Sequence, residues 1–329
     1  MEIIEHTAGR VAGPGLYRMP AEAYHADPCP APSLSSSIAK LLVEQSPAHA
    51  HAAHPRLGKV GQDGNNPTRP KEIGAVAHKL ILGQGVEVVA IDADDYTSGK
   101  VRLARAEAYG EGKTPILNAD RIVAERLAQR VEMRLAAVPG CSGFFDAPAE
   151  VVGVIRHRSG AWLRTMMDRV EIHATHAVIW DVKTGDVPAA PHTLGRRIVN
   201  MGMEVQAALY VRVLETLLPH LAGRVTFRWI FVENEAPNAL VVAEADATTL
   251  GIGGRKLALA LDRWNTACAK DSWPGYPAAI IRPEFPAWAE AQWQEREERE
   301  DAAARDRGEP LNWDVAASPF RPLGMGEAA

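Results

Sequence analysis

The sequence has few cysteines, no long apolar run and no excess of positive charge. Its 3 cysteines, at positions 29, 141 and 268, are odd in number and widely spaced. This excludes a disulfide framework and a four-cysteine iron–sulfur site, and it predicts reduced thiols in a cytoplasmic protein. The apolar segment 207–218 contains Arg212 and Glu215, so it is too short and too polar to cross a bilayer. No basic start followed by an apolar run marks a secretory signal, and we expect no membrane partner.

The charge balance also limits the possible functions. With 36 Lys and Arg against 41 Asp and Glu, the formal net charge is −5. Proteins that bind nucleic acids often carry a basic excess, because cationic side chains replace the counterions of the phosphates. A net-acidic chain can still bind DNA if its positive charge is local and its acidic residues hold a divalent metal. The composition, 47% hydrophobic and 23% charged, is that of an ordinary globular protein with a sizeable core.

Periodicity and turn residues predict helices first and strands later. Ser35, Ser36 and Ser37 form a hydroxyl cap for a helix that includes residues 38–43. The remaining expected elements, in chain order, are a loop at 55–70, a helix at 71–82, a helical region at 101–137 broken at 110–115, strands at 150–156, 162–172 and 177–184, a helix at 194–218, strands at 224–232 and 239–245, and a helix at 249–269.

This order predicts an α/β (α+β) fold with a mixed β-sheet flanked by helices. We expect three parts: an N-terminal extension with a helix at residues 1–70, a core at 71–290 and a charged C-terminal tail at 291–329. Residues 1–35 are rich in Pro, Gly and Ser and should be largely irregular. The Glu/Arg run 295–307 is typical of a solvated helix.

The stretch from residue 163 to 184 carries the chemistry. Asp168 lies near the end of one expected strand, and Asp181 and Lys183 lie in the next. A turn centred between residues 174 and 175 would place Asp168 opposite Asp181, with Cβ atoms about 4.5–5.5 Å apart. Two carboxylates this close repel each other unless a cation lies between them or one is protonated. Asp181 and Lys183 are two apart and share a face, while Trp180 and Val182 point into the core.

Two interpretations of this cluster are open. A surface Asp–Lys ion pair across two strands is the more common situation for charged residues. Alternatively, the carboxylates hold a metal, and the Lys183 ammonium positions a water molecule that the metal makes more acidic. Oxygen ligands with retained waters suit Mg²⁺, with Mn²⁺ as a substitute, rather than zinc.

Asp168, followed thirteen positions later by Asp181-Val182-Lys183-Thr184, resembles the D…D-x-K signature of the PD-(D/E)XK nuclease superfamily. The pattern is similar in particular to exodeoxyribonuclease VIII (RecE-like) and RecB-like nucleases. Further similar segments occur in the same order: Gly15-Leu16-Tyr17, Tyr24-His25 and Ser35–Leu42, Gly74–His78, Glu150, Gln206–Tyr210, and Trp273-Pro274. The resemblance covers roughly residues 14–290.

The resemblance implies a role for each matching position. Asp168, Asp181 and the main-chain carbonyl of Val182 would bind the metal, with His78 as a further ligand. Lys183 would orient the attacking water, and Glu150 would belong to the catalytic set. Gln206 and Tyr210, four apart on one helical face, would contact DNA or support the site. Without the resemblance, His78 is an ordinary histidine at the edge of a core, and Gln206 and Tyr210 are an ordinary polar stripe.

One position departs from the pattern. Relatives often have an arginine two residues before the hairpin aspartate, where this chain has Met166. We expect Arg164 and Arg169 to supply the phosphate contact instead. Arg197, together with Arg196, Arg224, Arg228 and Arg255-Lys256, could line a DNA path.

The function implied is hydrolysis of duplex DNA from its ends, 5′→3′, in homologous recombination of phage or prophage type in a bacterial cell. The resemblance also implies a ring-shaped homo-oligomer around DNA and a single-strand annealing protein as partner. An endonuclease or single-strand nuclease of the same fold is one alternative. A non-catalytic module that binds DNA ends or a recombinase is the other.

Two further patterns carry no functional prediction. His49, His51 and His54 lie between prolines without acidic partners, which favours a surface helix end over a metal site. Gly251, Gly253 and Gly254 are not a phosphate loop, since no Gly-Lys-Ser/Thr follows them.

Overall fold

The computed structural model describes residues 2–58 and 67–308. Contacts divide the chain into two units, residues 1–276 and 277–329, which are described separately. This division differs from the three parts predicted above, because the N-terminal segment and the predicted core form one unit. The predicted loop at 55–70 lies partly outside the described residues.

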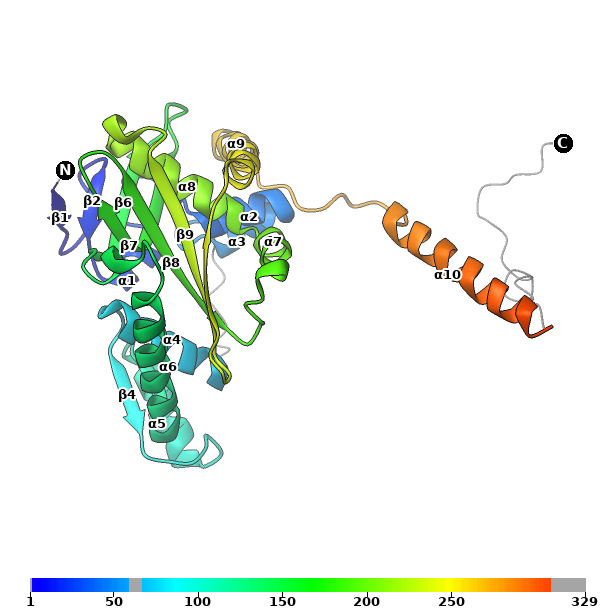
Figure 1. The fold of residues 1–329 in the computed structure, drawn as a ribbon. Helices are drawn as coiled ribbons and strands as arrows, with labels where there is room; N and C mark the ends of the chain where they lie inside the picture. Colours follow the sequence, from blue (N-terminus) through cyan, green and yellow to red (C-terminus); the bar gives the residue numbers. More distant parts are fainter. Residues whose placement is uncertain (1, 59–66, 309–329) are drawn as a thin grey trace. The chain divides into compact units, whose positions relative to one another are not determined.

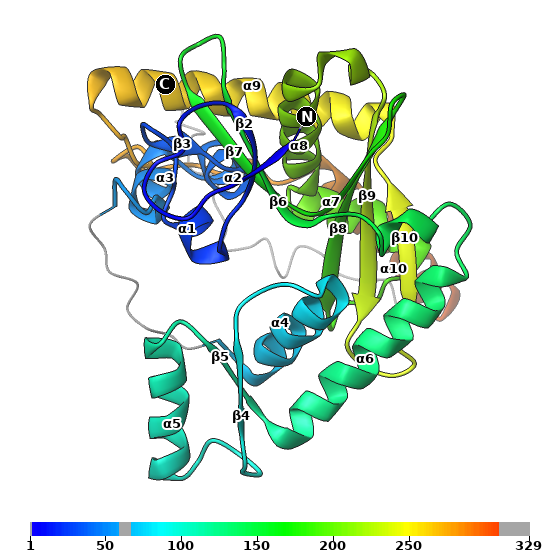
Figure 2. The same ribbon diagram turned by 90° about the vertical axis from the view of Figure 1, so that its left-hand side faces the viewer.

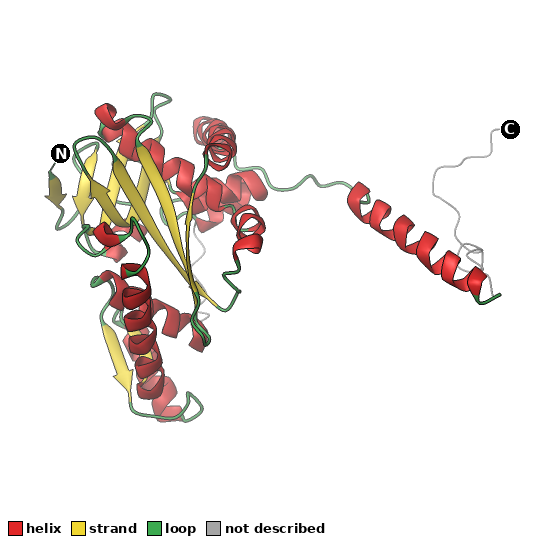
Figure 3. Cartoon of the chain, viewed as in Figure 1, coloured by secondary structure: helices red, strands yellow, loops and turns green. Residues whose placement is uncertain are grey.

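The first unit is built on a mixed eight-stranded sheet (Figures 1 and 3). Its strand order is β1 (Ile3–Glu5), β2 (Gly15–Arg18), β6 (Ala149–Arg156), β7 (Trp162–Ile172), β8 (Ala177–Gly185), β9 (Val225–Glu233) and β10 (Leu240–Glu244), and β3 (Ser33–Leu34) pairs with β7. The pairs β1–β2, β3–β7 and β8–β9 are parallel, and the others are antiparallel. The predicted mixed sheet is confirmed.

Helices cover both faces of this sheet because its central strands are apolar on both sides. One face packs on α2 (Ser36–Glu44), α8 (Met203–Leu217) and α9 (Ala247–Lys270), through residues such as Ile179 and Phe227. The other face packs on α4 (Arg69–Leu82) and α6 (Asn118–Ala136), through Trp180, Val182 and Ile230. Figure 2 shows α6 running towards β10. Alternate residues of β8 thus enter different helical layers.

Residues between α4 and β6 also form a small sheet of their own. β4 (Val88–Ile91) and β5 (Thr114–Leu117) pair in parallel, with α5 (Gly99–Gly110) between them in sequence. The break predicted at 110–115 is confirmed, but both short strands were missed because each is only four residues long. Buried Glu72 of α4 accepts hydrogen bonds from Arg105 Nε and Tyr109 Oη, which fixes α5 to α4.

Two other predictions need correction. The helix expected at 194–218 is two helices, α7 (Pro191–Asn200) and α8, separated at Gly202, whose φ of 57° is left-handed. The N-terminal 35 residues are more regular than predicted, since they contain β1, β2, β3 and α1 (Ala21–His25). The remaining short elements are α3 (Pro47–Ala53) and the 3₁₀ turns η1 (Ser142–Phe144) and η2 (Pro219–Leu221).

The glycines of α9 have a packing role. A Cβ on Gly253 would lie 2.0 Å from the main-chain oxygen of Glu204, so only glycine allows α8 and α9 to cross this closely. This agrees with the prediction that Gly251, Gly253 and Gly254 do not form a phosphate loop.

In the second unit the structure describes α10 (Ala287–Asp306), which confirms the helix expected in the Glu/Arg run. Residues 309–329 of the predicted tail lie outside the described ranges. In neither unit do the described residues include a helix with the length and apolar character needed to cross a bilayer.

Candidate active site

The predicted catalytic residues lie where two neighbouring strands part. The β7–β8 ladder pairs Ile172 with Ala177 and runs to Arg169 and Trp180, where it ends. Asp168 and Asp181 occupy the next positions, in the register expected from the sequence. At the beginning of β7, the strand β3 pairs with Trp162 and Leu163. The two aspartates therefore lie at the point where β7 and β8 begin to diverge.

The regular alternation of side chains also breaks here. Glu150 of β6 has a φ of 50°, which is unusual for a residue with a side chain. Its neighbours Ala149 and Val151 are two apart, yet they belong to the cores on opposite sheet faces. A break of this kind lets side chains from both helical layers reach one point.

Asp168 is held by groups from β8 and α4. Its Oδ2 accepts a hydrogen bond of 2.7 Å from the main-chain N–H of Val182, which closes the gap left by the parting strands. His78 Nε2 of α4 lies 3.1 Å from the same oxygen. α4 can come this close to β8 because a Cβ on Gly74 would already be 3.1 Å from Thr184 Oγ1.

Asp181 is held by its own strand and by α8. Its Oδ2 lies 2.7 Å from Lys183 Nζ, and its Oδ1 accepts a hydrogen bond of 2.7 Å from Gln206 Nε2. A carboxylate oxygen can accept more than one contact, so this buried oxygen keeps acceptor capacity beside the ion pair with Lys183. The Asp181 side chain is 3% exposed and that of Lys183 is 27% exposed. The ammonium thus reaches from a buried carboxylate towards solvent.

The pKa values of the two aspartates are shifted in opposite directions. Burial raises the pKa of Asp181; the Lys183 charge opposes this, and the Asp168 charge adds to it. Burial also disfavours the charged form of Asp168, but His78, the Lys183 charge and the Val182 N–H together outweigh burial, so the pKa of Asp168 is lowered. The pKa of Lys183 is raised, because the attraction of Asp181 and Asp168 outweighs the effect of its burial. The cluster would accept a further positive charge beside Asp181.

These donors fit a magnesium-type ion better than a zinc-type ion. Among residues 2–58 and 67–308, no group of three or more His, Cys, Asp or Glu side chains is arranged to hold a metal. Mg²⁺ needs only one or two carboxylates, with waters completing its shell. Val182 directs its N–H to Asp168, and in a strand the C=O of a residue lies on the same edge as its N–H. Asp168, Asp181 and the Val182 carbonyl therefore form a suitable all-oxygen set.

A cavity of about 690 Å³ opens over this cluster. Its floor includes Asp168, Asp181, Lys183 and Gln206, and Met166 lies beside them. The remaining wall comes from the N-terminal segment, α2, the end of α3, and α8, and it includes Tyr24, His25, Ser35–Ile38, Ala52–Pro55, Gly58, Arg164 and Tyr210. The N-terminal extension thus contributes directly to the site.

The two arginines expected to contact phosphate have different surroundings. Arg164 lines the cavity and is buried, with Nη1 donating to Ser33 O at 2.8 Å and Ser33 Oγ at 2.6 Å. Arg169 donates to the carbonyls of Ile81, Leu82, Phe145 and Ala147. The placement of Arg169 does not favour a phosphate contact, because its guanidinium is committed to joining the end of α4 to the sheet.

The other predicted residues lie around the cluster. Glu150 belongs to a separate pocket that includes Glu5, Arg18 and Gln84, and burial raises its pKa. Tyr210 is buried in the cavity wall, with its ring centroid 5.9 Å from that of Phe227.

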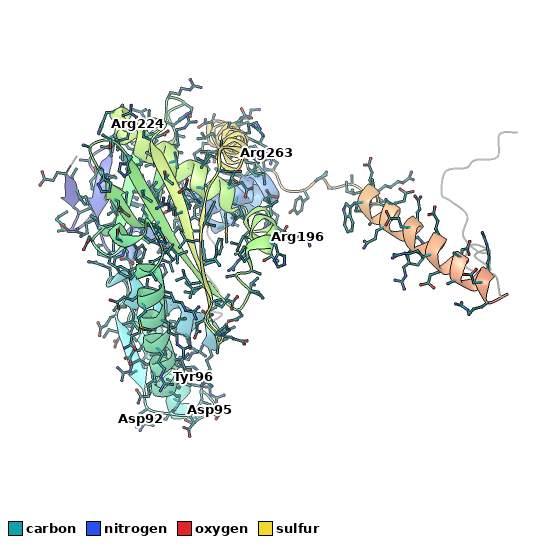
Figure 4. The ribbon with its side chains drawn as sticks, in the orientation of Figure 1. Asp92, Asp95, Tyr96, Arg196, Arg224 and Arg263 are labelled. Atoms are coloured by element: carbon teal, nitrogen blue, oxygen red, sulfur yellow. The ribbon has the colours of Figure 1, made fainter. Side chains whose placement is uncertain are left out.

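Arg197 of α7 lies further along the catalytic face of β8. Its guanidinium stacks on Phe231, and its Nη2 would lie 3.5 Å from a Cβ on Gly185. Gly185 is two residues beyond Lys183 and shares its face. Arg196 and Arg224, also considered for a DNA path, lie on α7 and just before β9 (Figure 4).

Sequence reasoning missed the buried network behind the cavity wall. Asp27 is fully buried and accepts hydrogen bonds from Ser33 N at 2.9 Å and Ser33 Oγ at 2.6 Å. His54 Nε2 lies 3.4 Å from Asp27, and Arg164 Nη1 lies 3.2 Å from it. His54 is therefore a core residue, and its prediction as part of a surface helix end was wrong. The Asp27–His54 pair is far apart in sequence, so no local pattern indicates it.

Comparisons with known proteins agree with this architecture. The family model of the PD-(D/E)XK nuclease superfamily matches residues 34–309. A protein from Eubacterium rectale named as a candidate exonuclease is similar in structure, with a TM-score of 0.51 and 11% identity over 82% of this chain and 96% of its own. The structure of SSO0001 gives a TM-score of 0.26 and 15% identity over 57% of this chain and 83% of its own, too low to support an argument. No curated protein matches the chain significantly.

Proposed function

Because the chain belongs to the PD-(D/E)XK nuclease superfamily, we propose that it is a metal-dependent exodeoxyribonuclease that hydrolyses phosphodiester bonds from the ends of duplex DNA. One observation carries this proposal. Asp168, Asp181 and Lys183 lie together where β7 and β8 diverge, and Asp181 is buried with a raised pKa. Two acids and a lysine that meet in a cavity are the groups of a cation-binding hydrolytic site, and a bound cation would favour the ionised form of Asp181.

Each residue of the site would have its own role in binding the metal, orienting water or positioning a carboxylate. Asp168, Asp181 and the Val182 carbonyl would hold Mg²⁺ or Mn²⁺, which when bound lowers the pKa of a water molecule and neutralises phosphate charge. Lys183 would orient that water through its exposed ammonium and stabilise negative charge on the phosphate. Gln206 fixes the orientation of the Asp181 carboxylate. His78 positions Asp168 through its Nε2 atom. We also propose His78 as a further ligand, a role in which Nε2 would exchange its contact with Asp168 for the metal.

The finer assignment rests on the RecE-like sequence pattern. We propose 5′→3′ resection in homologous recombination of phage or prophage type, with an annealing protein receiving the 3′ strand. A ring of subunits would let a chain of net charge −5 present a locally basic channel. The fold similarity to the Eubacterium rectale protein is compatible with exonuclease action.

A linear-versus-circular substrate assay tests the proposal. The purified chain is incubated with linear duplex and with covalently closed circular duplex, in Mg²⁺, in Mn²⁺ and in EDTA, and acid-soluble nucleotide is measured. We expect release from linear duplex only, and none in EDTA. Equal degradation of closed circles would instead identify an endonuclease of the same fold.

Matched variants separate catalysis from mere binding. Asp181→Asn should abolish release, whereas Asp262→Asn, which removes an exposed carboxylate on α9, should leave it unchanged. DNA end binding without hydrolysis by the wild type in either metal would identify the non-catalytic module instead.

A further inference from the structure

Another pocket of the first unit lies apart from the hydrolytic cluster, at the end of α4 and beside α6. Its volume is about 360 Å³. Apolar side chains and two carboxylates line it, including those of Leu80, Ile81, Glu125, Ala128, Glu132 and Phe145. None of these residues lines the cavity over Asp168 and Asp181. This α4–α6 pocket is therefore a separate feature with its own chemistry.

Arg169 also lines the α4–α6 pocket, and it points to a ligand. It is 8% exposed, and its Nε is a buried donor with no hydrogen-bond partner among residues 2–58 and 67–308. Its other nitrogens donate to carbonyls of α4 and of the turn before β6. An unpaired buried donor on a cation is costly unless an acceptor completes it, so the pocket favours a ligand that brings one.

The surface beside the pocket is apolar and exposed. Leu80 of α4 and Ile122 and Met133 of α6 are large side chains that solvent reaches. Ile122 lies one helical turn before Glu125, and Met133 directly follows Glu132, so both adjoin the pocket. Exposed apolar side chains that gather at one place mark an interaction surface.

The carboxylates of the pocket favour a cationic partner. Glu125 already pairs with Arg121, at 3.0 Å. Glu132 forms no ion pair with any residue that the structure describes. A partner that fits the pocket would thus carry apolar side chains, a positive charge and a free hydrogen-bond acceptor.

Residues 277–286, in the second unit, have all three of these features. Every one of them is exposed, and their side chains include Ile280 at 97%, Ile281 at 62% and Phe285. Arg282 lies among them. Apart from the first and the last, their carbonyls accept no hydrogen bond from any residue in the described part of the chain. The prolines at positions 277, 283 and 286 favour an extended conformation, which leaves these groups available.

The lengths of the pocket surface and of this segment also agree. Residues 280–285 in an extended, polyproline-like conformation span roughly 16 Å. α6 rises by about the same length between Ile122 and Met133. One extended segment can therefore lie along the pocket and reach the apolar residues at both of its ends.

We propose that residues 280–285 of one copy occupy the α4–α6 pocket of a second copy of this chain. The isoleucines and Phe285 contact the apolar walls, and Arg282 pairs with Glu132. A main-chain carbonyl of the segment accepts from Arg169 Nε. This contact would hold together the homo-oligomer proposed above, so in that respect it rests on the proposed function.

Analytical ultracentrifugation of the full chain over a dilution series measures the association. We expect the wild type to assemble and Ile281→Asp to weaken association by about a hundredfold, because a carboxylate would enter the apolar pocket. Leu103→Asp is the matched control, since Leu103 is 60% exposed on α5 and does not line the pocket. It should associate as the wild type does. Circular dichroism melting should show both variants folded.

A charge reversal tests the pairing of Arg282 with Glu132. Arg282→Glu and Glu132→Arg should each weaken association by about tenfold, and the two together in one chain should restore it. Glu284→Arg is the control within the same segment, because position 284 lies on a different edge of a polyproline-like helix from position 282. It should not weaken association.

Cross-linking tests whether the contact forms between copies. Cys268 is exposed, so Cys268→Ser is the background. Chains with Arg282→Cys are mixed with chains with Glu132→Cys and treated with oxidised glutathione, and disulfide-linked dimers are measured on a non-reducing gel. We expect linked dimers from the mixture, and far fewer from either chain alone.

Each outcome decides the proposal. Weakening by the segment and pocket variants, restoration by the double reversal and linked dimers from the mixture support it. A wild type that stays monomeric, variants that associate like the wild type, or a mixture without linked dimers would overturn it. Hydrolysis of linear duplex is measured on the same samples. Hydrolysis by a monomeric wild type would leave the proposed enzyme intact while the contact fails, and assembly without hydrolysis would do the reverse.

Discussion

Asp27 and Asp181 are both buried carboxylates close to the same cavity, but their surroundings differ. Asp27 accepts hydrogen bonds from Ser33 and lies near His54 and Arg164. Burial disfavours its charged form, but these partners outweigh burial and hold its pKa at about 2. Asp181 has Lys183 and Gln206, and its pKa is raised.

The comparison shows how to separate structural acids from functional ones. A buried acid whose partners satisfy it stabilises the fold and gains nothing from a ligand. A buried acid whose partners only partly stabilise its ionised form can be stabilised further by a bound cation. On this criterion Asp27 is structural and Asp181 is functional, and the following measurements challenge that division.

The largest effect should come from removing the functional carboxylate. We expect Asp181→Asn to lower nucleotide release by a thousandfold or more, about 4 kcal/mol in the activation free energy. Its thermal stability should be unchanged or higher, because a poorly compensated buried charge is lost. Release assays and thermal melts check both parts. Loss of activity together with a large drop in melting temperature would place Asp181 in the same class as Asp27.

Lys183→Met should slow release by about a hundredfold, since it removes the ammonium that orients water but leaves both carboxylates. The rate should remain dependent on Mg²⁺. Lys100→Met, on an exposed position of α5, is the control for loss of a lysine. If Lys183→Met were as active as the control, the ammonium would have no part in hydrolysis.

Asp27 should instead control stability at acid pH. Its folded pKa of about 2 lies below its ordinary value of 3.8. Its contribution, about 2 kcal/mol, is therefore present above pH 4 and is lost as the pH falls from 4 towards 2. Urea unfolding at pH 6 and pH 3 should show this loss in the wild type and not in Asp27→Asn, which should be destabilised already at pH 6. The exposed control Asp262→Asn should follow the wild type; equal pH dependence of Asp27→Asn would refute the assignment.

The smallest effect should come from Gln206, which supports Asp181 by one hydrogen bond. Gln206→Leu should lower the rate about tenfold and shift the acidic limb of the pH–rate profile to higher pH, because loss of a donor raises the pKa of Asp181 further. Gln129→Leu, on the exposed side of α6, serves as control. A rate loss without the shift would mean that Gln206 acts on something other than Asp181.

Local patterns predicted the central part of the fold. The strand periodicity of β6, β7 and β8 set the Asp168–Asp181 register, and the serines marked the start of α2. What could not be predicted depended on contacts distant in sequence. Neither the left-handed Glu150 nor the commitment of Arg169 to four carbonyls leaves a local signal. Asp27 likewise depends on His54 and Arg164, which are brought to it only by folding.

Arg169 has a consequence for how this protein could diversify. Its hydrogen bonds fix the last turn of α4 to the strand that carries Asp168, so His78 and Asp168, which flank the segment 83–138 in the sequence, are held in place. That segment begins directly after the locked turn and returns to β6. Within it, residues 92–113, which carry α5 between β4 and β5, can be lengthened, exchanged or fused to another recognition module by an engineer, or by evolution, while α6 stays packed on the sheet and the spacing of the reactive groups stays the same.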